Sequence, residues 1–544
     1  MTEKSKIETT SGKPAHPQVE SLCDQLTSGR IDRRSFLRSM TWLGVTAASA
    51  SAFAGFIPAP ARAETPVAGG KLRFGCAIQE ITDPALTSWI EASNLYRNSL
   101  EYLTYVDADN IVHPYLAKSW APSADLTVWD FELDERAKWS NGDAFAPEDV
   151  IANIQRWTSP DSKSSNKTAF EAIKLVEKTG PHSVRFTLSR PVASLPEQLY
   201  SYTCAIVHRD FDKSGANWPA NPIGTGPFKL VSFEVGRQAT FAKRADYWGT
   251  PAHLDEIQYI DLGTDIATHL AALASNQVDL IYRATIAEYD LMKSLPNIQI
   301  LTGSAAHTLV MRMQVDAKPF DDIRVRKAVQ LAADNKQMLD VVYRGEGQIG
   351  GNYHVSPIQP DHFPLEPVAR DVAKAKALLA EAGYPNGIDI ELTLGNTQGR
   401  WEQDTAQVLQ QNLAEAGIRL KLNVLPAAQY WPVWDKVPFG ATYWAHRPLG
   451  SMTLDLAYRS GAAWNESHFA DPAFDAALDS AMGTVDPEAR KAAMEACQTI
   501  LRDQAVMVQA YWPGRFSAAG KNVRGFVLHP ADYFRMDGVW LAKA

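Results

Sequence analysis

One stretch of the chain reproduces a nucleotide-binding fingerprint letter for letter. Gly345, Gly347 and Gly350 have the spacing G-x-G-x-x-G. That spacing binds a pyrophosphate when it joins a strand to the first turn of a helix. Here the segment follows a predicted helix over residues 336–343 and runs into Asn352 and two prolines. The context therefore argues against a dinucleotide site.

Other catalytic motifs are missing from the sequence. It contains no G-x-S-x-G, no H-E-x-x-H and no P-loop, and its 12 histidines show no metal-ligand spacing. Carboxylates are numerous, but nothing in their order along the chain nominates two of them as the acid and nucleophile of a glycosidase. We therefore expect a protein that is not an enzyme, with no cofactor and no metal.

Tryptophan is the side chain with the most suggestive placement. The chain has 15 tryptophans, and several are concentrated between Trp401 and Trp464. Clustered aromatic residues with few charges between them can line a ligand cleft. They can equally fill a core, where most tryptophans lie. Composition leaves both alternatives open.

The N-terminal region carries an export pattern. The pair Arg33-Arg34, followed by Ser-Phe-Leu-Arg, closes a basic segment. The apolar stretch Thr41–Ile57 follows and is short and only mildly hydrophobic for a membrane span. Together these features predict a twin-arginine (Tat) signal, although Asp32 stands where such signals usually have Ser or Thr. The alternative is an ordinary amphipathic N-terminal helix.

A cleavage site follows the apolar stretch. Ala61 and Ala63 supply the small residues of a signal-peptidase site. We expect residues 1–63 to be removed by cleavage after Ala63, so that the mature chain begins near Glu64 in the periplasm. No cysteine follows the cleavage site, which argues against a lipid anchor.

Charge and cysteine content restrict the partners. The chain has a formal net charge of −9, and the leader holds eight of the basic and five of the acidic residues, which leaves −12 on the mature part. An acidic surface argues against nucleic acid as a partner. The mature chain retains Cys76, Cys204 and Cys497, too few for a disulfide framework, although one bridge can form in an oxidising compartment.

Predicted strands and helices alternate along the chain, which indicates an α/β or α+β class with mixed β-sheets flanked by helices. About 480 mature residues are too many for one core, so at least two domains are expected. Period-two alternation predicts strands such as Val128–Leu133. The other predicted strands are 71–75, 183–188, 278–282, 388–394 and 419–424, and the predicted helices are 266–275, 323–334, 336–343, 371–382, 402–416 and 486–502.

Six segments match, in order, the motifs of one family. They are Val112–Trp120 (VHPYLAKSW), Trp139–Val150 (WSNGDAFAPEDV), Gly224–Leu230 (GTGPFKL), Asp246–Gly249 (DYWG), Pro319–Val329 (PFDDIRVRKAV) and Lys374–Pro385 (KAKALLAEAGYP). The chain resembles the family 5 extracellular solute-binding proteins of ABC importers, which include peptide-, nickel- and opine-binding members. The matches span nearly all of residues 69–526. They consist mostly of scaffold residues, so they predict the fold and the class of protein better than the identity of the ligand.

Two of these motifs carry polar or flexible residues that could be mistaken for a site. We expect Arg324 and Arg326 to tie their helix to neighbouring carboxylates. We expect Gly224 and Gly226 to supply turn geometry before a strand rather than a phosphate cradle.

The resemblance implies a two-lobed periplasmic binding protein fold with a ligand cleft between the lobes. Lobe 1 would comprise residues 64–304 plus 512–544, with an inserted subdomain at about 111–222, and lobe 2 residues 305–511. A small-molecule ligand would close the lobes about a hinge. ABC permease subunits at the inner membrane would recognise the closed form, and the protein would act as a monomer.

The resemblance also points to a pocket. Peptide-binding members use a W-x-x-D segment whose Asp holds the peptide's amino terminus, and the matching stretch here is Trp444-Ala445-His446-Arg447. Arg447 would repel an ammonium group and suit a carboxylate or phosphate. The alternative is that Arg447 forms a salt bridge with Asp455 or Glu466.

Further ligand-binding candidates rest on position within the family pattern. Trp444 is the first choice for stacking, and His446 lies beside it. The other candidates are Trp431, Trp434, Trp89 and Tyr202. The segment Trp464–His468 could add polar contacts or could be a packing turn.

Three functions remain open from the sequence. The first is the binding component of an ABC importer for a small polar solute, anionic or neutral, such as an opine, a sugar acid, an oligosaccharide or an atypical peptide. The second is a nickel or metal-chelate binder of the same fold, with His446 and His468 touching the chelate. The third is a periplasmic hydrolase.

Overall fold

A computed structural model describes residues 16–54 and 64–543 of the chain. The chain separates into two compact units, here called unit 1 (Met1–Gly303 with Arg515–Ala544) and unit 2 (Ser304–Gly514). The backbone therefore passes from one unit to the other twice. Over the described residues, none of the helices combines the length and the apolar character needed to cross a membrane.

The core of unit 1 is a seven-stranded mixed sheet in the order β12-β20-β11-β1-β10-β9-β8. Its strands are β1 (Lys71–Cys76), β8 (Phe228–Glu234), β9 (Gln238–Lys243), β10 (Glu256–Asp261), β11 (Leu280–Ile281), β12 (Ile298–Gly303) and β20 (Arg515–Gly520). Strand β1 lies between two parallel partners, β10 and β11. The C-terminal strand β20 pairs antiparallel with both β11 and β12, so the end of the chain completes the sheet formed by its first half.

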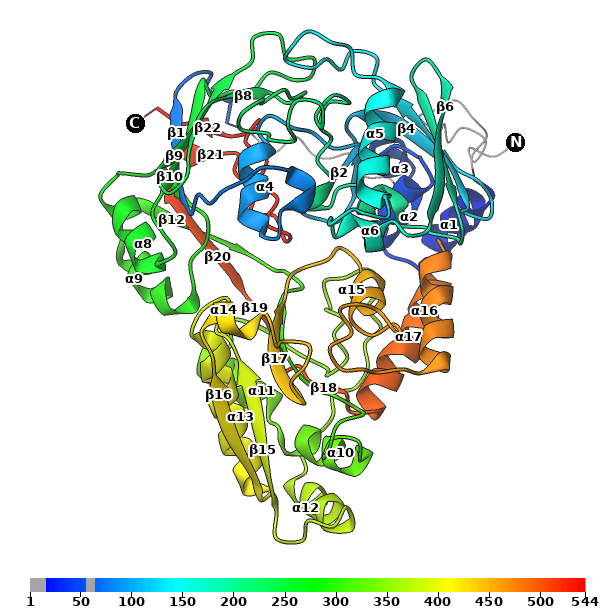
Figure 1. The fold of residues 1–544 in the computed structure, drawn as a ribbon, viewed down its shortest axis with the longest axis vertical. Helices are drawn as coiled ribbons and strands as arrows, with labels where there is room; N and C mark the ends of the chain where they lie inside the picture. The colour runs from blue at the N-terminus through cyan, green and yellow to red at the C-terminus, as the bar shows by residue number, and fades with distance from the viewer. Residues whose placement is uncertain (1–15, 55–63, 544) are drawn as a thin grey trace. The chain divides into compact units, whose positions relative to one another are not determined.

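A second sheet of unit 1 has four antiparallel strands in the order β4-β5-β7-β6. They are β4 (Ala117–Pro122), β5 (Val128–Leu133), β6 (Ile173–Gly180) and β7 (Ser183–Leu188). In β5 every second residue is buried, and Trp129 and Phe131 are fully so. Figure 1 shows helix α5 (Pro147–Thr158) beside this sheet. Unit 1 also contains two short two-stranded ladders, β2 (Thr104–Val106) with β3 (Val112–Pro114) and β21 (Val523–Arg524) with β22 (Trp540–Leu541). Its further helices are α4 (Ile90–Tyr96), α6 (Asn166–Ala169), α7 (Leu195–Gln198), α8 (Ile266–Ala274) and α9 (Tyr289–Ser294).

The N-terminal segment forms three helices, α1 (Gln18–Thr27), α2 (Arg33–Trp42) and α3 (Ala47–Phe53). Asp32 caps α2 by accepting a hydrogen bond from the Ser35 N–H at 2.7 Å, so it fills the N-cap role that Ser or Thr would otherwise fill. The indole N–H of Trp120 on β4 donates to the carbonyls of Thr41 and Trp42 at 3.0 and 3.1 Å. The segment is therefore packed on unit 1, while the expected cleavage site at Ala63 lies outside the described residues.

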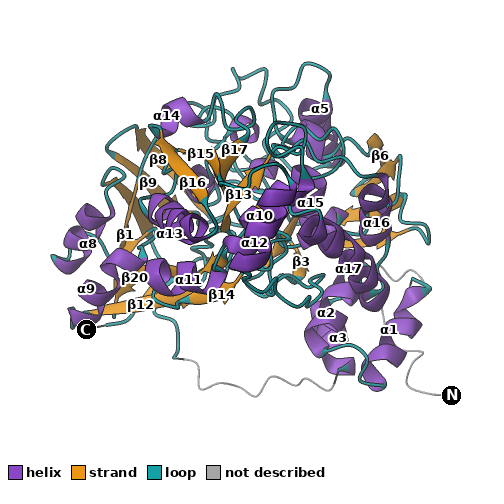
Figure 2. Cartoon of the chain, turned by 90° about the horizontal axis from the view of Figure 1, so that it is seen from below, coloured by secondary structure: helices purple, strands orange, loops and turns teal. Residues whose placement is uncertain are grey.

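Unit 2 is built on a five-stranded mixed sheet in the order β16-β15-β17-β13-β18. Its strands are β13 (Thr308–Met313), β15 (Ile388–Leu394), β16 (Ile418–Val424), β17 (Phe439–Trp444) and β18 (Met507–Val508), and β14 (Gly347–Ile349) pairs separately with β19 (Tyr511–Pro513). The helices are α10 (Ile323–Ala332), α11 (Asn335–Tyr343), α12 (Val372–Glu381), α13 (Trp401–Glu415), α14 (Ala427–Tyr430), α15 (Gly450–Ala457), α16 (Pro472–Gly483) and α17 (Pro487–Asp503). Figure 1 shows α13 running along β15 and β16. In Figure 2, α10 and α12 lie side by side.

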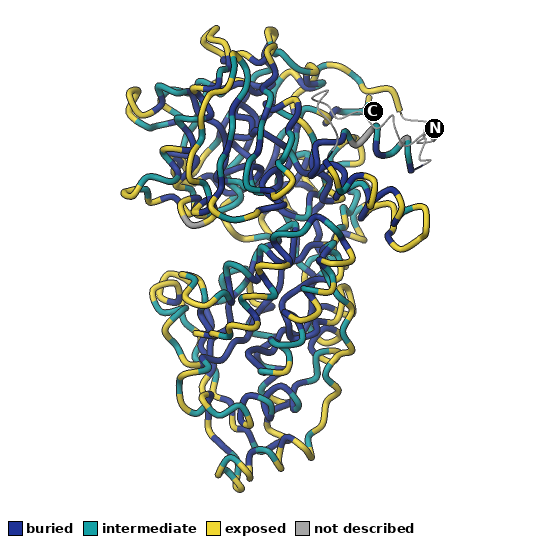
Figure 3. The backbone as a smooth tube through the Cα atoms, turned by 90° about the vertical axis from the view of Figure 1, so that its right-hand side faces the viewer, coloured by how far each residue is buried: buried dark blue, intermediate teal, exposed yellow. Residues whose placement is uncertain are grey.

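Elements with a strong local pattern occur where the sequence predicts them. The predicted strands 128–133, 183–188 and 388–394 coincide with β5, β7 and β15. Helix α12 begins after its N-cap Asp371 and ends just before Gly383, whose φ of +96° suits a glycine at that position. The predicted strand 278–282 is shorter than expected, because only β11 is strand. In Figure 3 buried and exposed stretches alternate along the backbone, and within β5 and β7 every second residue is buried.

Two expectations about the family motifs need correction. Arg324 does pair with Asp322, but the guanidinium of Arg326 is buried and donates to the backbone carbonyls of Phe320 and Gln504, not to carboxylates. Gly224 is needed for close approach and not for turn geometry, because a Cβ there would lie 1.9 Å from the carbonyl oxygen of Ser99.

The structure also answers two sequence-based questions, about a disulfide bridge and about the glycine-rich segment. The thiols of Cys76, Cys204 and Cys497 are free and buried, so the one bridge that the sequence allowed is not formed. In the G-x-G-x-x-G segment, residues 347–349 form the short strand β14, which opens no helix. This geometry agrees with the rejection of a dinucleotide site.

Candidate functional site

The candidate site in unit 2 lies where β17 ends. Trp444 is the last residue of this strand, which runs parallel to β15 and antiparallel to β13. In open α/β sheets, ligand sites form beyond the carboxyl ends of parallel strands. The segment 445–449 leads from this end into α15.

The loop after β17 is held by backbone hydrogen bonds. The carboxylate of Asp361 accepts hydrogen bonds from the N–H groups of Gly450 and Ser451, at 2.7 and 2.8 Å, and so binds the first turn of α15. The side-chain amide of Gln359 donates to the carbonyl of Arg447 at 2.9 Å. The backbone is therefore held at Arg447 itself and again at the start of α15.

A buried carboxylate orients Trp444. Glu466 accepts the indole N–H of Trp444 at 2.8 Å, the hydroxyl of Thr442 at 2.7 Å and the Nε–H of Arg312 at 2.9 Å. Burial raises the pKa of Glu466, and the charge of Arg312 opposes that rise. Three donors around one carboxylate, one of them a guanidinium, are the arrangement that a buried charge requires.

Arg312 extends this network to the neighbouring loop. Its guanidinium is fully buried and donates to the carbonyls of Val437, at 2.6 Å, and Trp434. Gly440 lies opposite Arg312 in the sheet, and a Cβ there would stand 2.8 Å from the Arg312 Nη2 atom. A glycine at this position therefore leaves room for the arginine.

Four tryptophans form a continuous row, here called the tryptophan row. Ring centroids are separated by 6.3 Å between Trp431 and Trp434, 6.2 Å between Trp434 and Trp464, and 6.0 Å between Trp464 and Trp444. Trp444 is buried, whereas Trp431 and Trp464 remain 46% and 40% exposed. The row therefore continues from the core to the surface of unit 2.

The guanidinium of Arg447 lies over this row. Its central carbon is 5.7 Å from the ring centroid of Trp444 and 6.0 Å from that of Trp464, within the range of a cation–π contact. The two carboxylates considered as its salt-bridge partners are bound by other arginines, Asp455 by Arg459 and Glu466 by Arg312. The arrangement joins a half-buried cation to an aromatic surface.

Two histidines lie close to Trp444. The Nδ1 atom of His446 accepts the backbone N–H of Ala306 at 2.9 Å, so any contact with a solute would be made by its Nε2 side. His354 packs edge-on against Trp444 with a centroid distance of 5.3 Å. Burial, aided by the positive charge of Arg447, lowers the pKa of His354 to about 3, and His354 is therefore neutral at physiological pH.

Comparison with known proteins decides the class. The model of the bacterial extracellular solute-binding proteins, family 5, middle part, matches residues 112–465. This chain belongs to that family. The structure and the comparisons confirm the two-lobed periplasmic binding protein fold that the sequence predicted.

Several relatives of this family 5 solute-binding protein are known. Heme-binding protein A of Haemophilus influenzae is 26% identical over 461 residues, 79% of this chain and 84% of that protein. The glutathione-binding protein GsiB of Salmonella typhi is 25% identical over 452 residues, 79% and 86% of the two chains. The structure of AgaA from A. tumefaciens R10 in complex with agropinic acid superposes with a TM-score of 0.76 at 25% identity and covers 87% of this chain and 99% of AgaA. These relatives are binding proteins, and family 5 members bind small ligands and work with ABC permeases.

Two of the remaining ligand-binding candidates of this family 5 protein lie in unit 1, and His468 forms an ion pair with another residue. Trp89 directly precedes α4 and is partly exposed. The backbone carbonyl of Tyr202 accepts the hydroxyls of Tyr96 and Tyr102, at 2.8 and 3.1 Å. His468 pairs with Asp316 at 2.9 Å. Across residues 16–54 and 64–543, no group of three or more His, Cys, Asp or Glu side chains could hold a metal ion.

Sequence reasoning missed the pair that supports the site. No sequence motif points to Arg312, and Glu466 is expected only as a partner of Arg447 or as part of the segment Trp464–His468. The signal was present, because β13 (TLVMRM) reads as an otherwise apolar strand and all six of its residues are buried. A buried arginine in such a strand requires a carboxylate, but the sequence does not say which one.

Proposed function

We propose that this chain is the periplasmic binding component of an ABC importer that captures a small polar solute bearing a carboxylate. An opine, a sugar acid, an acidic oligosaccharide or an atypical peptide would meet that description. The observation that carries the proposal is the half-buried guanidinium of Arg447 above Trp444 and Trp464.

The chemistry of this pair favours an acid over a free amine. A guanidinium presents a planar fork of N–H donors that matches the two oxygens of a carboxylate. An ammonium group at the same place would be repelled, and the repulsion grows as water is excluded. The relative AgaA, solved with agropinic acid, supports the same class of ligand.

The tryptophan row supplies the second half of recognition. Exposed indole faces at Trp464 and Trp431 can stack on the apolar face of a sugar or an opine. Trp444 cannot turn away from its position, since its indole N–H is bound by Glu466. We therefore assign stacking on the solute to the exposed Trp464 and Trp431, which the buried Trp444 and the half-buried Trp434 support from behind. Charge pairing is assigned to Arg447, with His446, Trp89 and Tyr202 as further contacts.

Delivery to the permease would follow from hinge closure. The backbone passes between the units after Gly303 and after Gly514, and these two crossings would form the hinge. A solute that shifts the population of closed molecules from 1:99 to 99:1 must bind the closed form better by about 5.5 kcal/mol. The permease would then recognise the closed form.

The cellular location forms part of the proposal. Arg33-Arg34 at the start of α2 would direct the folded chain to the Tat pathway, and cleavage after Ala63 would release residues 64–544 into the periplasm. The periplasmic binding proteins among its structural relatives support this location.

A thermal-shift screen tests the proposed ligand class. The exported chain, unfolded and refolded to remove carried-over solute, is heated with agropinic acid, sugar acids, neutral oligosaccharides, dipeptides and nickel–histidine. A ligand at 100 times its dissociation constant stabilises the folded state by about 2.7 kcal/mol, a measurable shift. We expect carboxylate-bearing compounds to stabilise the wild type. Stabilisation by neutral oligosaccharides, by plain dipeptides alone or by a nickel chelate that EDTA removes would contradict the proposal.

A further inference from the structure

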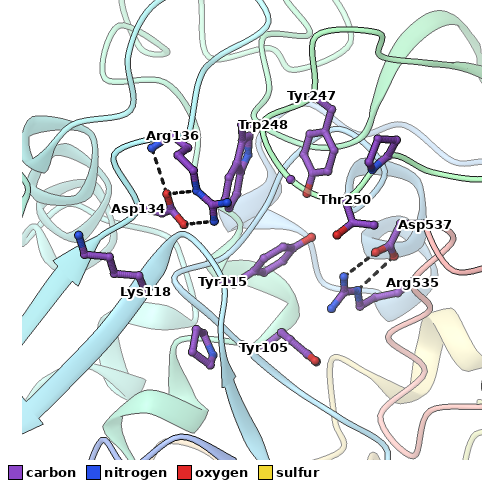
Figure 4. Close-up of a pocket in the computed structure, with 13 residues that line it drawn as sticks. Tyr105, Tyr115, Lys118, Asp134, Arg136, Tyr247, Trp248, Thr250, Arg535 and Asp537 are labelled. Atoms are coloured by element: carbon purple, nitrogen blue, oxygen red, sulfur yellow. Dashed lines mark hydrogen bonds and ion pairs between the residues drawn. The ribbon is translucent and has the colours of Figure 1, made fainter. Parts of the chain in front are cut away.

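A cavity lies wholly within unit 1 (Figure 4). Its volume is about 700 Å³, which is within the range of small-molecule sites. Three separate parts of the chain line it, residues 105–136, 247–251 and 535–537. The tryptophan row belongs to unit 2, so the two sets of residues are distinct and this inference does not depend on the proposed function.

Aromatic side chains form much of the cavity wall. Tyr105 and Tyr115 meet edge to face at 5.8 Å, and Tyr247 and Trp248 are 5.7 Å apart. The guanidinium of Arg535 lies 4.4 Å from the ring centroid of Tyr105 and 5.1 Å from that of Tyr115. The guanidinium of Arg136 lies 5.7 Å from the ring centroid of Trp248 in the same way. The wall therefore combines aromatic rings with arginines that lie over ring faces.

The wall is supported from behind by a buried carboxyl group. Glu101 is fully buried, accepts the hydroxyl of Tyr247 at 2.5 Å and accepts the indole N–H of Trp248 at 3.0 Å. Burial raises the pKa of Glu101 to about 7. The orientations of Tyr247 and Trp248 are thus fixed before any ligand arrives.

The charged groups of the cavity are arranged as two matching pairs. Arg136 binds Asp134, and Arg535 binds Asp537, each through Nε and Nη2 with a shortest distance of 2.6 Å. Figure 4 shows the two pairs on opposite sides, with Tyr115 between them. In the part of the chain that the structure describes, neither arginine uses its Nη1 atom in a hydrogen bond at this cavity.

Lys118 is the fifth charged residue of the lining and gives the cavity a net positive charge. Lys118 is exposed, and no hydrogen bond or ion pair engages its ammonium group within residues 16–54 and 64–543. The lining thus holds three basic and two acidic side chains in a protein whose overall charge is −9. An anion of small size would be attracted here although the molecule as a whole is acidic.

We propose that this cavity is a second binding site, for a small ring compound with a carboxylate, of the uronic-acid class. The C–H face of the ring stacks on Trp248 and Tyr115. The carboxylate pairs with Lys118 and the outward N–H groups of Arg136, while Asp537 accepts from ring hydroxyls. Each of these groups stands on the cavity wall in Figure 4.

Calorimetric titration of the full chain tests the site with three probes, sodium D-glucuronate, D-glucose and sodium acetate. We expect glucuronate to bind at least tenfold more tightly than glucose and acetate to give no heat. The variant Lys118→Glu, at an exposed position, should weaken glucuronate binding at least tenfold, and Arg136→Gln should weaken it several-fold. The matched variant Lys174→Glu, an exposed lysine of β6 outside the cavity, should bind as the wild type does.

Three results would overturn the site. If glucuronate gives no heat at millimolar concentration, the cavity does not bind compounds of the uronic-acid class. Equal affinities for glucuronate in Lys118→Glu and the wild type would show that glucuronate binds outside this cavity. Loss of glucuronate binding in Arg447→Ala with retention in Lys118→Glu assigns it to the tryptophan row of unit 2. Circular dichroism of Lys118→Glu and of the milder Lys118→Ala confirms that both variants are folded.

Discussion

The indole N–H of Trp444 donates to the buried carboxylate of Glu466 at 2.8 Å. The same carboxylate binds the guanidinium of Arg312, which also holds the carbonyl of Trp434. Two members of the tryptophan row therefore depend on one buried ion pair. The recognition surface and the core of unit 2 share this network, so changes to the pair should affect both stability and binding.

Removal of the Glu466 carboxylate should destabilise unit 2. In Glu466→Leu the guanidinium of Arg312 remains buried without its counter-ion, and loss of one partner of a buried pair costs about 3–5 kcal/mol. Thermal denaturation should show a lower midpoint for unit 2. The double variant Arg312→Met/Glu466→Leu should recover much of the loss.

A surface pair provides the control for that experiment. Glu391 and Lys421 form an exposed ion pair across β15 and β16 at 2.7 Å. Such pairs contribute about 0–1 kcal/mol, so Glu391→Leu should change the midpoint little. Equal losses in Glu391→Leu and Glu466→Leu would show that burial of the Arg312 pair has no special importance.

The close packing at Gly224, the first glycine of the GTG motif, can be tested by adding one methyl group. Gly224→Ala should destabilise unit 1 by about 2 kcal/mol or more, because its Cβ would lie 1.9 Å from the carbonyl oxygen of Ser99 and the backbone must move. At Gly538 a Cβ meets nothing within 4 Å, so Gly538→Ala should stay within about 0.5 kcal/mol of the wild type. Chemical denaturation measures both. A neutral Gly224→Ala would contradict the close approach.

His354 makes unit 2 sensitive to acid. Its pKa falls from 6.5 in the unfolded chain to about 3 in the folded one, so between these values the unfolded state binds more protons. Stability is therefore lost as the pH falls below 6.5, by about 2 kcal/mol for this residue at pH 5.

The variant His354→Asn isolates this contribution. Asparagine tolerates the positive φ of 54° at this position and does not titrate. The difference in melting temperature between pH 7 and pH 5 should be smaller in His354→Asn than in the wild type. An unchanged difference would mean that His354 is protonated in the folded state at pH 5.

Export provides a test in the cell. The double variant Arg33→Lys/Arg34→Lys should accumulate as uncleaved precursor, since the Tat pathway requires the arginine pair. Arg30→Lys, three residues upstream, should be exported normally. Fractionation followed by mass spectrometry of the N-terminus measures both the location and the cleavage site. Normal export of the double variant would contradict a Tat signal.

Local patterns allowed much of the fold to be predicted. The alternation in Val128–Leu133 reports which face of one strand is buried, and Asp371 and Gly383 mark the two ends of one helix. These signals need only neighbouring residues. The family motifs added the two-lobed fold, because they occur in the same order as in the relatives.

Long-range pairing set the limit of prediction. Arg312 and Glu466 are 154 positions apart, and only the fold brings them together. The cavity of unit 1 combines Lys118, Trp248 and Arg535, which no spacing rule connects. Arg326 illustrates the same limit, because its acceptors are backbone carbonyls, and these have no signature in sequence.

The most direct test of the binding account is a titration of the best carboxylate ligand from the thermal screen into wild type, Arg447→Ala and Arg447→Asp. A hydrogen bond between charged groups contributes about 1.5–3 kcal/mol, so Arg447→Ala should bind at least about tenfold more weakly and Arg447→Asp more weakly still. Arg400→Ala, an exposed arginine on the same unit, should leave the affinity unchanged. Equal affinity in wild type and Arg447→Ala would contradict the assignment of Arg447 to the ligand.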